Sequence, residues 1–251
     1  MAIKITKIST WLANNGQAIT NASKATMENA IMADVSQLYD GVFIMYHRKG
    51  DNSPLAVRVS SWTSLQASGE VADGVLLVEG GRYLVIAPTE ASSLKWSSKP
   101  VSDTNTSGSV QISGVTTTGD RLAALNNFAG RASTTAIING STSTNVTNTA
   151  DYAAGFCNKY SRQNVNGKGL TAGGWWLPSV GELAMILANF DKINYALSKI
   201  SGATQLQPSW YWTSTQGSAG TAWALHLGAG AMFYGWKFYQ YGVRPVSAFL
   251  Q

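Results

Sequence analysis

The sequence predicts an α+β protein, and two kinds of periodicity support this fold class. Apolar residues recur three and four positions apart in several segments, as on one face of a helix, whereas apolar and polar residues alternate in others, as in a half-buried strand. Gly, Pro, Ser, Thr and Asn cluster between these segments, where turns and loops are expected. The 251 residues suffice for one large domain or two small ones, each with a buried core.

The first part of the chain, residues 1–70, is expected to form a small α+β unit. A helix is predicted over residues 21–39, where apolar side chains recur at helical spacing before Gly41. The apolar run at residues 42–46 and the alternating pattern at residues 55–60 predict two strands, joined by a turn-forming cluster at residues 50–54.

A hairpin and two loops are predicted next. Residues 74–79 and 82–87 form short apolar runs, and the Gly80-Gly81 dipeptide between them tolerates the positive φ angles of a tight hairpin turn. Residues 99–118 and 139–149 consist mainly of Ser, Thr, Gly and Asn, so we expect both to be surface loops.

Helical spacing returns in the second half of the chain. It appears in two short patterns, the first with Leu122, Leu125 and Phe128, the second with Ala153, Phe156, Cys157 and Tyr160. The position of Cys157 on an apolar stripe indicates a small buried hydrophobe. Ser179 and Glu182 predict a capping box at the start of a longer helix, and a second short helix carries Ile193, Leu197 and Ile200.

The chain is poor in charge, which excludes several functions. Only 12% of residues are charged, against roughly a quarter in an ordinary domain, and the net charge is +5. A single cysteine excludes an intrachain disulfide and a cysteine-based zinc site. Lys and Arg do not cluster, so we expect no nucleic-acid partner. We also expect no membrane insertion and no secretion, because no export signal or long apolar run is visible.

Enzyme signatures are missing from the sequence, and we expect no catalytic activity and no cofactor. A hydrolase would depend on a carboxylate or on His226, one of only two histidines. Residues 223–228 alternate large apolar with small or polar side chains, which predicts a half-buried strand. Ala224, His226 and Gly228 are expected on its outward face, where His226 is a ligand contact, an indifferent surface residue or, least favoured, a catalytic base.

Aromatic residues concentrate where charge is scarcest. The 49 residues 203–251 contain eleven aromatic side chains and only two charges, Lys237 and Arg244. A strand through residues 233–241 cannot place all of its rings on one face, so some rings are expected to be exposed. These rings could form a core strand, but rings among small uncharged residues are also typical of binding surfaces, where they supply contact area at low entropic cost.

Several motifs, in order along the chain, resemble the variable proteins of diversity-generating retroelements. They are Gly174-Trp-Trp-Leu-Pro-Ser179, Trp210-Tyr-Trp-Thr-Ser-Thr215, Ala222-Trp223 and Val243-Arg-Pro-Val246, preceded by the strands at residues 74–88 and the helix of Cys157. The resemblance covers about residues 71–251. It implies a C-type-lectin-like domain, also found in formylglycine-generating enzymes, with two helices and short antiparallel sheets, whereas residues 1–70 would attach or oligomerise the protein.

The resemblance also implies a function and a site. In such systems a reverse transcriptase replaces the 3′ part of the gene with copies altered at template adenines, so the encoded surface varies and binds changing receptors. The variable region would span about residues 211–242. Candidate ligand-binding positions are Tyr211, Gly217, Gly220, Ala224, His226, Gly228, Ala229, Ala231, Phe233, Tyr234, Gly235, Trp236, Phe238, Tyr239, Tyr241 and Gly242. Scaffold positions would be Trp212, Trp223, Leu225, Leu227, Lys237, Val243, Arg244 and Pro245.

The sequence lacks the metal-binding and catalytic residues of two related groups of proteins. The calcium-binding loop and strand of C-type lectins are missing, and a lone Cys157 cannot supply the paired cysteines of the formylglycine-generating relatives. We therefore expect neither a metal nor catalysis. The predicted function is receptor binding from a phage tail tip, with a host-cell surface protein or glycan as partner and a homotrimer for avidity. The alternative is a lectin-like domain that binds a glycan or small molecule without diversification.

Overall fold

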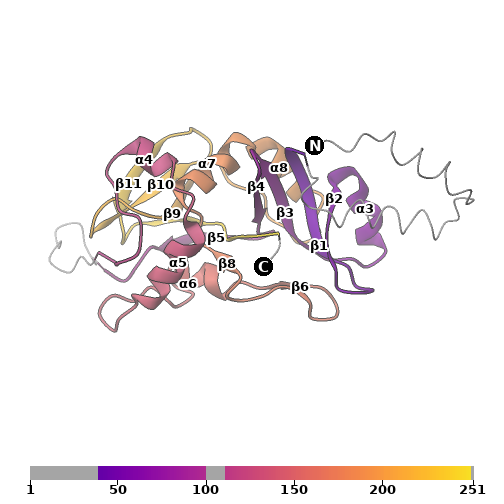
Figure 1. Cartoon of the computed structure of the whole chain (residues 1–251), viewed down its shortest axis with the longest axis horizontal. Coiled ribbons are helices and arrows are strands. Elements are labelled where there is room, and N and C mark those ends of the chain that lie inside the picture. The colour runs from indigo at the N-terminus through magenta and orange to yellow at the C-terminus, as the bar shows by residue number, and fades with distance from the viewer. Residues whose placement is uncertain (1–38, 100–110, 250–251) are drawn as a thin grey trace, which may run out of the picture.

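The computed structural model describes residues 39–99 and 111–249, which form two sheets placed end to end along the long axis of the molecule (Figure 1). The first sheet is antiparallel throughout. Its strand order is β2 (Pro54–Arg58), β1 (Gly41–His47), β3 (Ala72–Glu79), β4 (Arg82–Ile86), β13 (Val246–Ser247) and β8 (Trp175–Trp176).

The second sheet carries most of the aromatic segment. Its strand order is β11 (Met232–Trp236), β10 (Thr221–His226), β9 (Trp210–Gln216), β12 (Gln240–Val243) and β5 (Ala91–Lys95). All neighbours are antiparallel except β12 and β9, which run parallel. A separate two-stranded ribbon joins β6 (Arg162–Gln163) to β7 (Gly169–Leu170).

Six helices belong to the described residues, which confirms the α+β class. They are α3 (Val59–Ala67), α4 (Arg121–Leu125), α5 (Gly130–Asn139), α6 (Ala153–Lys159), α7 (Val180–Ala188) and α8 (Phe190–Leu197). Helix α7 packs against β9 and β10 of the second sheet and α8 against β1 and β3 of the first (Figure 1). Ile186 and Leu197 of these helices share one core with Ile44 of the first sheet and Leu225 of the second. No helix within the described ranges is long and apolar enough to cross a membrane.

Several predicted elements are confirmed. Strands β1 and β2 flank the predicted turn, and Gly80 and Gly81 join β3 to β4 with φ angles of 55° and 75°. Helices α6, α7 and α8 form where helical spacing recurs. Glu182 accepts a hydrogen bond of 2.8 Å from the backbone N–H of Ser179, as the predicted capping box requires. Cys157 is fully buried.

Two helices differ from the sequence expectation. The alternating pattern expected to run as a strand to Ser60 ends at Arg58, and α3 begins at Val59, because Trp62 turns into the core and packs against Tyr46. Helix α5 was not predicted because Ile137 is the only large apolar side chain among its buried residues, which otherwise are Gly130, Ser133 and Thr134. Thr134 exchanges hydrogen bonds with the backbone of Leu177, so this face is buried without an apolar stripe.

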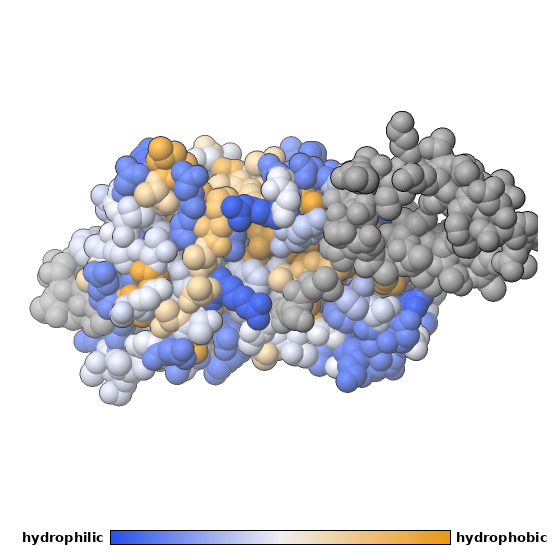
Figure 2. Space-filling model, in the orientation of Figure 1, coloured by the Kyte–Doolittle hydropathy of each residue, from blue (hydrophilic) through white to orange (hydrophobic). Residues whose placement is uncertain are grey.

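Further differences concern exposure and organisation. Helix α4 forms, but its leucines face solvent: Leu122 is 68% exposed and Leu125 37%, and Figure 2 shows an apolar patch over the position of α4. Strands β1 and β2 continue the sheet of β3 and β4, so this sheet crosses the expected domain boundary at residue 70. The helix predicted over residues 21–39 lies almost entirely outside the described residues.

A buried ion pair joins two of the places where the chain passes from one sheet to the other. Arg244 follows β12 and Glu90 precedes β5, and their side chains approach to 2.7 Å. The Arg244 guanidinium also donates to the carbonyls of Ala87 and Thr204, at 2.9 and 3.0 Å. The hydroxyl of Tyr211 donates to the same Glu90 oxygen at 2.7 Å. One buried carboxylate therefore holds both crossings and β9 together.

Candidate ligand-binding surface

Seven aromatic side chains of the second sheet form a continuous series of ring contacts, which we call the aromatic strip. Successive ring centroids lie between 4.5 and 6.4 Å apart, a range typical of edge-to-face and offset aromatic pairs. In order of contact the strip contains His226, Trp210, Phe233, Tyr241, Tyr239, Phe238 and Trp236.

Cross-strand register explains why these rings meet. His226 pairs with Trp210, and Ala224 lies between Trp212 of β9 and Phe233 of β11. Side chains directly opposite each other on neighbouring strands point to the same face, so the large rings close over the small Ala224. Beneath the strip, Trp212 contacts Tyr241 at 4.5 Å and donates its indole N–H to the carbonyl of Leu94. The strip therefore rests on a rigid, buried base.

The opposite face of β11 carries one further exposed ring. Tyr234 is 49% exposed and meets Trp223 edge to face at 5.0 Å, beside the core contact of Trp223 with Ala124 and Val180. Tyr239 of the strip is 36% exposed. The prediction that the rings of residues 233–241 divide between two faces, with some of them exposed, is confirmed.

Neither charge of the aromatic segment reaches the surface. Arg244 is paired with Glu90, and Lys237 is 1% exposed. The Lys237 ammonium donates to the side-chain oxygen of Gln216 at 2.7 Å and lies 4.4 Å from the ring centre of Trp96. The described part of the segment thus presents rings, amides and hydroxyls to solvent, without formal charge.

The His226 ring accepts two backbone hydrogen bonds within the strip. Its ring Nδ1 accepts hydrogen bonds from the backbone N–H groups of Gly228 and Ala229, at 3.2 and 3.1 Å. A nitrogen that accepts carries no proton, so the tautomer is the one protonated at Nε2. The ring stands edge-on to Trp210, so its position fits a contact residue better than a general base.

The candidate positions differ widely in exposure. Those open to solvent are Gly228, Ala229, Ala231, Tyr234 and Tyr239, and the half-buried ones are Gly217, His226, Phe233, Trp236, Phe238 and Tyr241. The remaining candidates are buried and present no side chain to solvent: Tyr211, Gly220, Ala224, Gly235 and Gly242. All of the expected scaffold positions are buried.

The burial of Ala224 and Tyr211 has local causes, and close contacts leave little room for a side chain at Gly242 and at half-buried Gly217. Strand β10 is covered on both faces, so its alternation does not mark an outward face and Ala224 is only 1% exposed. Tyr211 points into the core, where its hydroxyl bonds Glu90 and burial raises the pKa of the phenol. A Cβ on Gly242 would lie 2.9 Å from the Tyr211 ring, and one on Gly217 would lie 2.6 Å from Tyr234.

Sequence reasoning missed Trp210, although it touches three members of the strip. The available signal was alternation: residues 210 and 212 of β9 are two apart, so their side chains lie on the same face of the strand. What the sequence could not supply was the pairing with His226, which depends on the register between β9 and β10.

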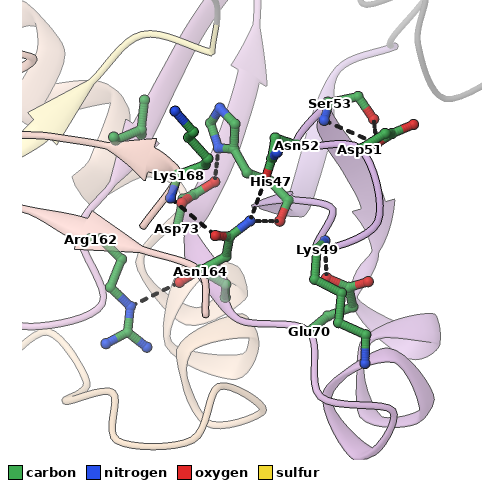
Figure 3. A network of polar contacts seen from close by, with 12 residues as sticks. His47, Lys49, Asp51, Asn52, Ser53, Glu70, Asp73, Arg162, Asn164 and Lys168 are labelled. Carbon is green, nitrogen blue, oxygen red and sulfur yellow. Dashed lines mark hydrogen bonds and ion pairs between the residues drawn. The ribbon is translucent and has the colours of Figure 1, made fainter. Parts of the chain in front are cut away.

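A second polar cluster lies on the first sheet, away from the strip (Figure 3). Nδ1 of His47 and a carboxyl oxygen of buried Asp73 form a hydrogen bond of 2.6 Å, and burial raises the pKa of this carboxyl. Asn164 of the β6–β7 hairpin donates to the carbonyl of His47 and accepts from the N–H groups of Asn166 and Lys168. These contacts hold the hairpin against β1, so the cluster has a structural role. Within the described ranges no group of acidic, His or Cys side chains could hold a metal ion.

Comparisons with known proteins show no family. No family model and no curated protein matches the chain. A fimbrial protein from Bacteroides ovatus ATCC 8483, known from a crystal structure, is similar over 66% of this chain, with 21% sequence identity and a TM-score of 0.42. The match covers 35% of that protein, so this chain corresponds to about a third of its length.

Proposed function

We propose that this chain is a binding protein, not an enzyme, and that the aromatic strip contacts a receptor on a host-cell surface. The observation that carries the proposal is the strip itself: its rings are in continuous contact, several are partly exposed, and Lys237 and Arg244, the two charges of the aromatic segment, are buried. Rigid rings lose little entropy on binding and bury large apolar areas, which is why Tyr and Trp dominate binding surfaces.

The proposal includes diversification by a retroelement on a C-type-lectin-like domain. What supports it is the separation between candidate variable and scaffold residues along one short segment. Phe233, Tyr234 and Tyr239 reach solvent, whereas the intervening Lys237 and the flanking Trp223 and Val243 are buried. Side chains that reach solvent can change without loss of core packing. The proposed carrier is a phage tail tip, and the receptor is a host surface protein or glycan.

The alternative function is binding of a glycan without diversification. One contact favours it: the rings of Trp236 and Phe238 are nearly parallel, at an interplanar angle of 18° and a centroid distance of 6.4 Å. Such a pair offers a flat apolar ledge, which suits the C–H face of a sugar ring.

The DNA downstream of the gene separates the two proposals. A near-copy of the codons for residues 211–251, altered only where the template has adenine and next to a reverse-transcriptase gene, is expected under diversification. If the genomic sequence shows no such repeat, diversification is refuted and the glycan proposal stands alone.

The strip itself is tested by binding measurements. We expect Trp236→Ala combined with Tyr239→Ala to abolish binding of labelled protein to intact candidate host cells or to an array of bacterial glycans. Tyr195→Ala is the matched control, because Tyr195 is 57% exposed on α8 and lies outside the strip. Equal binding by the double variant and the control would place the site elsewhere.

A further inference from the structure

We propose that β11 pairs, antiparallel, with β11 of a second copy of this chain across a twofold axis at Tyr234. Strand β11 is the outer strand of the second sheet, at the end of the molecule farthest from the first sheet (Figure 1). No other strand of the described residues pairs with its outer side. The inference is independent of the proposed receptor binding.

Register shows which backbone groups of β11 face outward. The N–H of His226 donates to Ala231, and the N–H of Lys237 donates to Gly220, so residues 231 and 237 face β10. Hydrogen-bonded and non-hydrogen-bonded pairs alternate along an antiparallel ladder, so residues 233 and 235 also face β10. The amide groups of Met232, Tyr234 and Trp236 therefore point away from the sheet, spaced as a partner strand requires.

The other outer strands carry features that oppose pairing, and β11 carries none. Strand β2 begins at Pro54 and ends at Arg58, and β8 has only two residues. Strand β5 ends at Lys95, which already bridges to Tyr152. Proline, charge and short length are the usual protections of a sheet edge. The sequence of β11, Met-Phe-Tyr-Gly-Trp, has neither charge nor proline, so pairing meets no repulsion.

Pairing about Tyr234 makes the side chains complementary. With residue 234 opposite itself, Phe233 lies opposite Gly235 of the partner subunit, so the two Phe233 rings, each of which covers Gly235 of its own chain, are not set directly against each other. On the other face, Met232 lies opposite Trp236 of the partner subunit, a favourable sulfur–aromatic pair. A shift by two residues would set Phe233 against Phe233 of the partner subunit or Gly235 against its own copy, which removes this fit.

The pairing would join two sheets into one and leave their faces open. A twofold axis through an antiparallel edge pair is perpendicular to the sheet, so the part of the strip formed by His226, Trp210 and Phe233 lies on the same face of the joined sheet in both copies. Two copies would thus present adjacent strips to one surface, which raises avidity without a new contact to the ligand. If residues 1–70 hold a trimer, the same pairing joins two trimers.

Sedimentation of the full chain from micromolar to millimolar concentration tests the pairing. We expect the wild type to double in mass as concentration rises. Tyr234→Pro removes the outward N–H and leaves the ladder with β10 intact, so the dissociation constant is expected to rise at least about tenfold, because each pairing loses two hydrogen bonds. Tyr234→Ala is the matched control, since it removes the ring but keeps the N–H, and we expect a smaller effect.

A charge exchange tests the twofold axis directly and does not depend on the proline variant folding. Tyr234→Lys and Tyr234→Asp each place like charges opposite each other and are expected to prevent doubling, whereas an equimolar mixture restores it as a mixed pair. The proposal is overturned if the wild type does not double at millimolar concentration, if the proline and alanine variants associate alike, or if the mixture fails to associate while the wild type does.

Discussion

Replacement of Arg244 by Met is expected to be severely destabilising, because it leaves a buried carboxylate without its countercharge. Glu90 is only 8% exposed, and Arg244 is its ion-pair partner at 2.7 Å. Met has a similar length and no charge, so the change removes the guanidinium with little loss of packing volume. The carbonyls of Ala87 and Thr204 also lose a donor each.

The size of the loss follows from what remains buried. Removal of one partner of a buried ion pair costs about 3–5 kcal/mol of unfolding free energy, most of it from the stranded charge. In a chain of this size, 1 kcal/mol corresponds to a melting-temperature shift of about 2–4 °C. We therefore expect Arg244→Met to lower the melting temperature by roughly 6–20 °C.

The double variant Arg244→Met with Glu90→Gln isolates the cause. Gln is neutral and its side-chain oxygen still accepts from the Tyr211 hydroxyl, so the double variant is expected to recover about half or more of the lost stability. Urea unfolding followed by circular dichroism gives the free energies, and calorimetry gives the melting temperatures. A loss below about 1 kcal/mol in the single variant, or a double variant no more stable than the single, would refute this reasoning.

Three further outcomes are expected. Burial raises the pKa of Glu182 in the folded state. The free energy of unfolding of the wild type, relative to that of Glu182→Gln, should therefore fall as the pH rises from about 4.3 through the raised folded-state pKa. Urea unfolding at several pH values tests this, and a difference that does not change with pH would contradict it. Gly242→Ala should cost about 1–3 kcal/mol of unfolding free energy, because its Cβ would lie 2.9 Å from the buried Tyr211 ring, whereas Gly235→Ala, whose Cβ would lie 3.3 Å from ring atoms that need shift only slightly, should be nearly neutral. Equal losses in urea unfolding would show that Tyr211 can move. Burial raises the pKa of the Cys157 thiol well above its usual value, so a maleimide should label it only in denaturant, and rapid labelling of the native protein would show that α6 opens.

Local patterns predicted the elements whose cause is local. Gly80-Gly81 predicted the turn between β3 and β4 because positive φ angles are a property of the glycines themselves. Apolar residues at helical spacing predicted helices α6, α7 and α8. The capping role of Glu182 was predicted from its position three residues after Ser179. The helices with weak patterns, α3 and α5, depended instead on what packs against them.

Exposure within the candidate site was only partly predictable. Alternation along residues 233–241 established that the rings divide between two faces, and Tyr234 and Tyr239 are exposed as expected. The same rule failed for Ala224, because a strand in the middle of a covered sheet has no outward face. The burial of Tyr211 could not be predicted for a related reason: Glu90, the hydrogen-bond partner of its hydroxyl, lies 121 residues away in the sequence.

By itself the sequence determined that charge is scarce and aromatic rings are abundant in the last 49 residues, and that some of those rings must be exposed. Only the tertiary structure decided which small residues lie beneath the rings, that Trp210 belongs to the strip, and that both local charges are buried. The physical reason is that composition and periodicity are properties of neighbours along the chain, whereas burial depends on the side chains that neighbouring strands place opposite each residue.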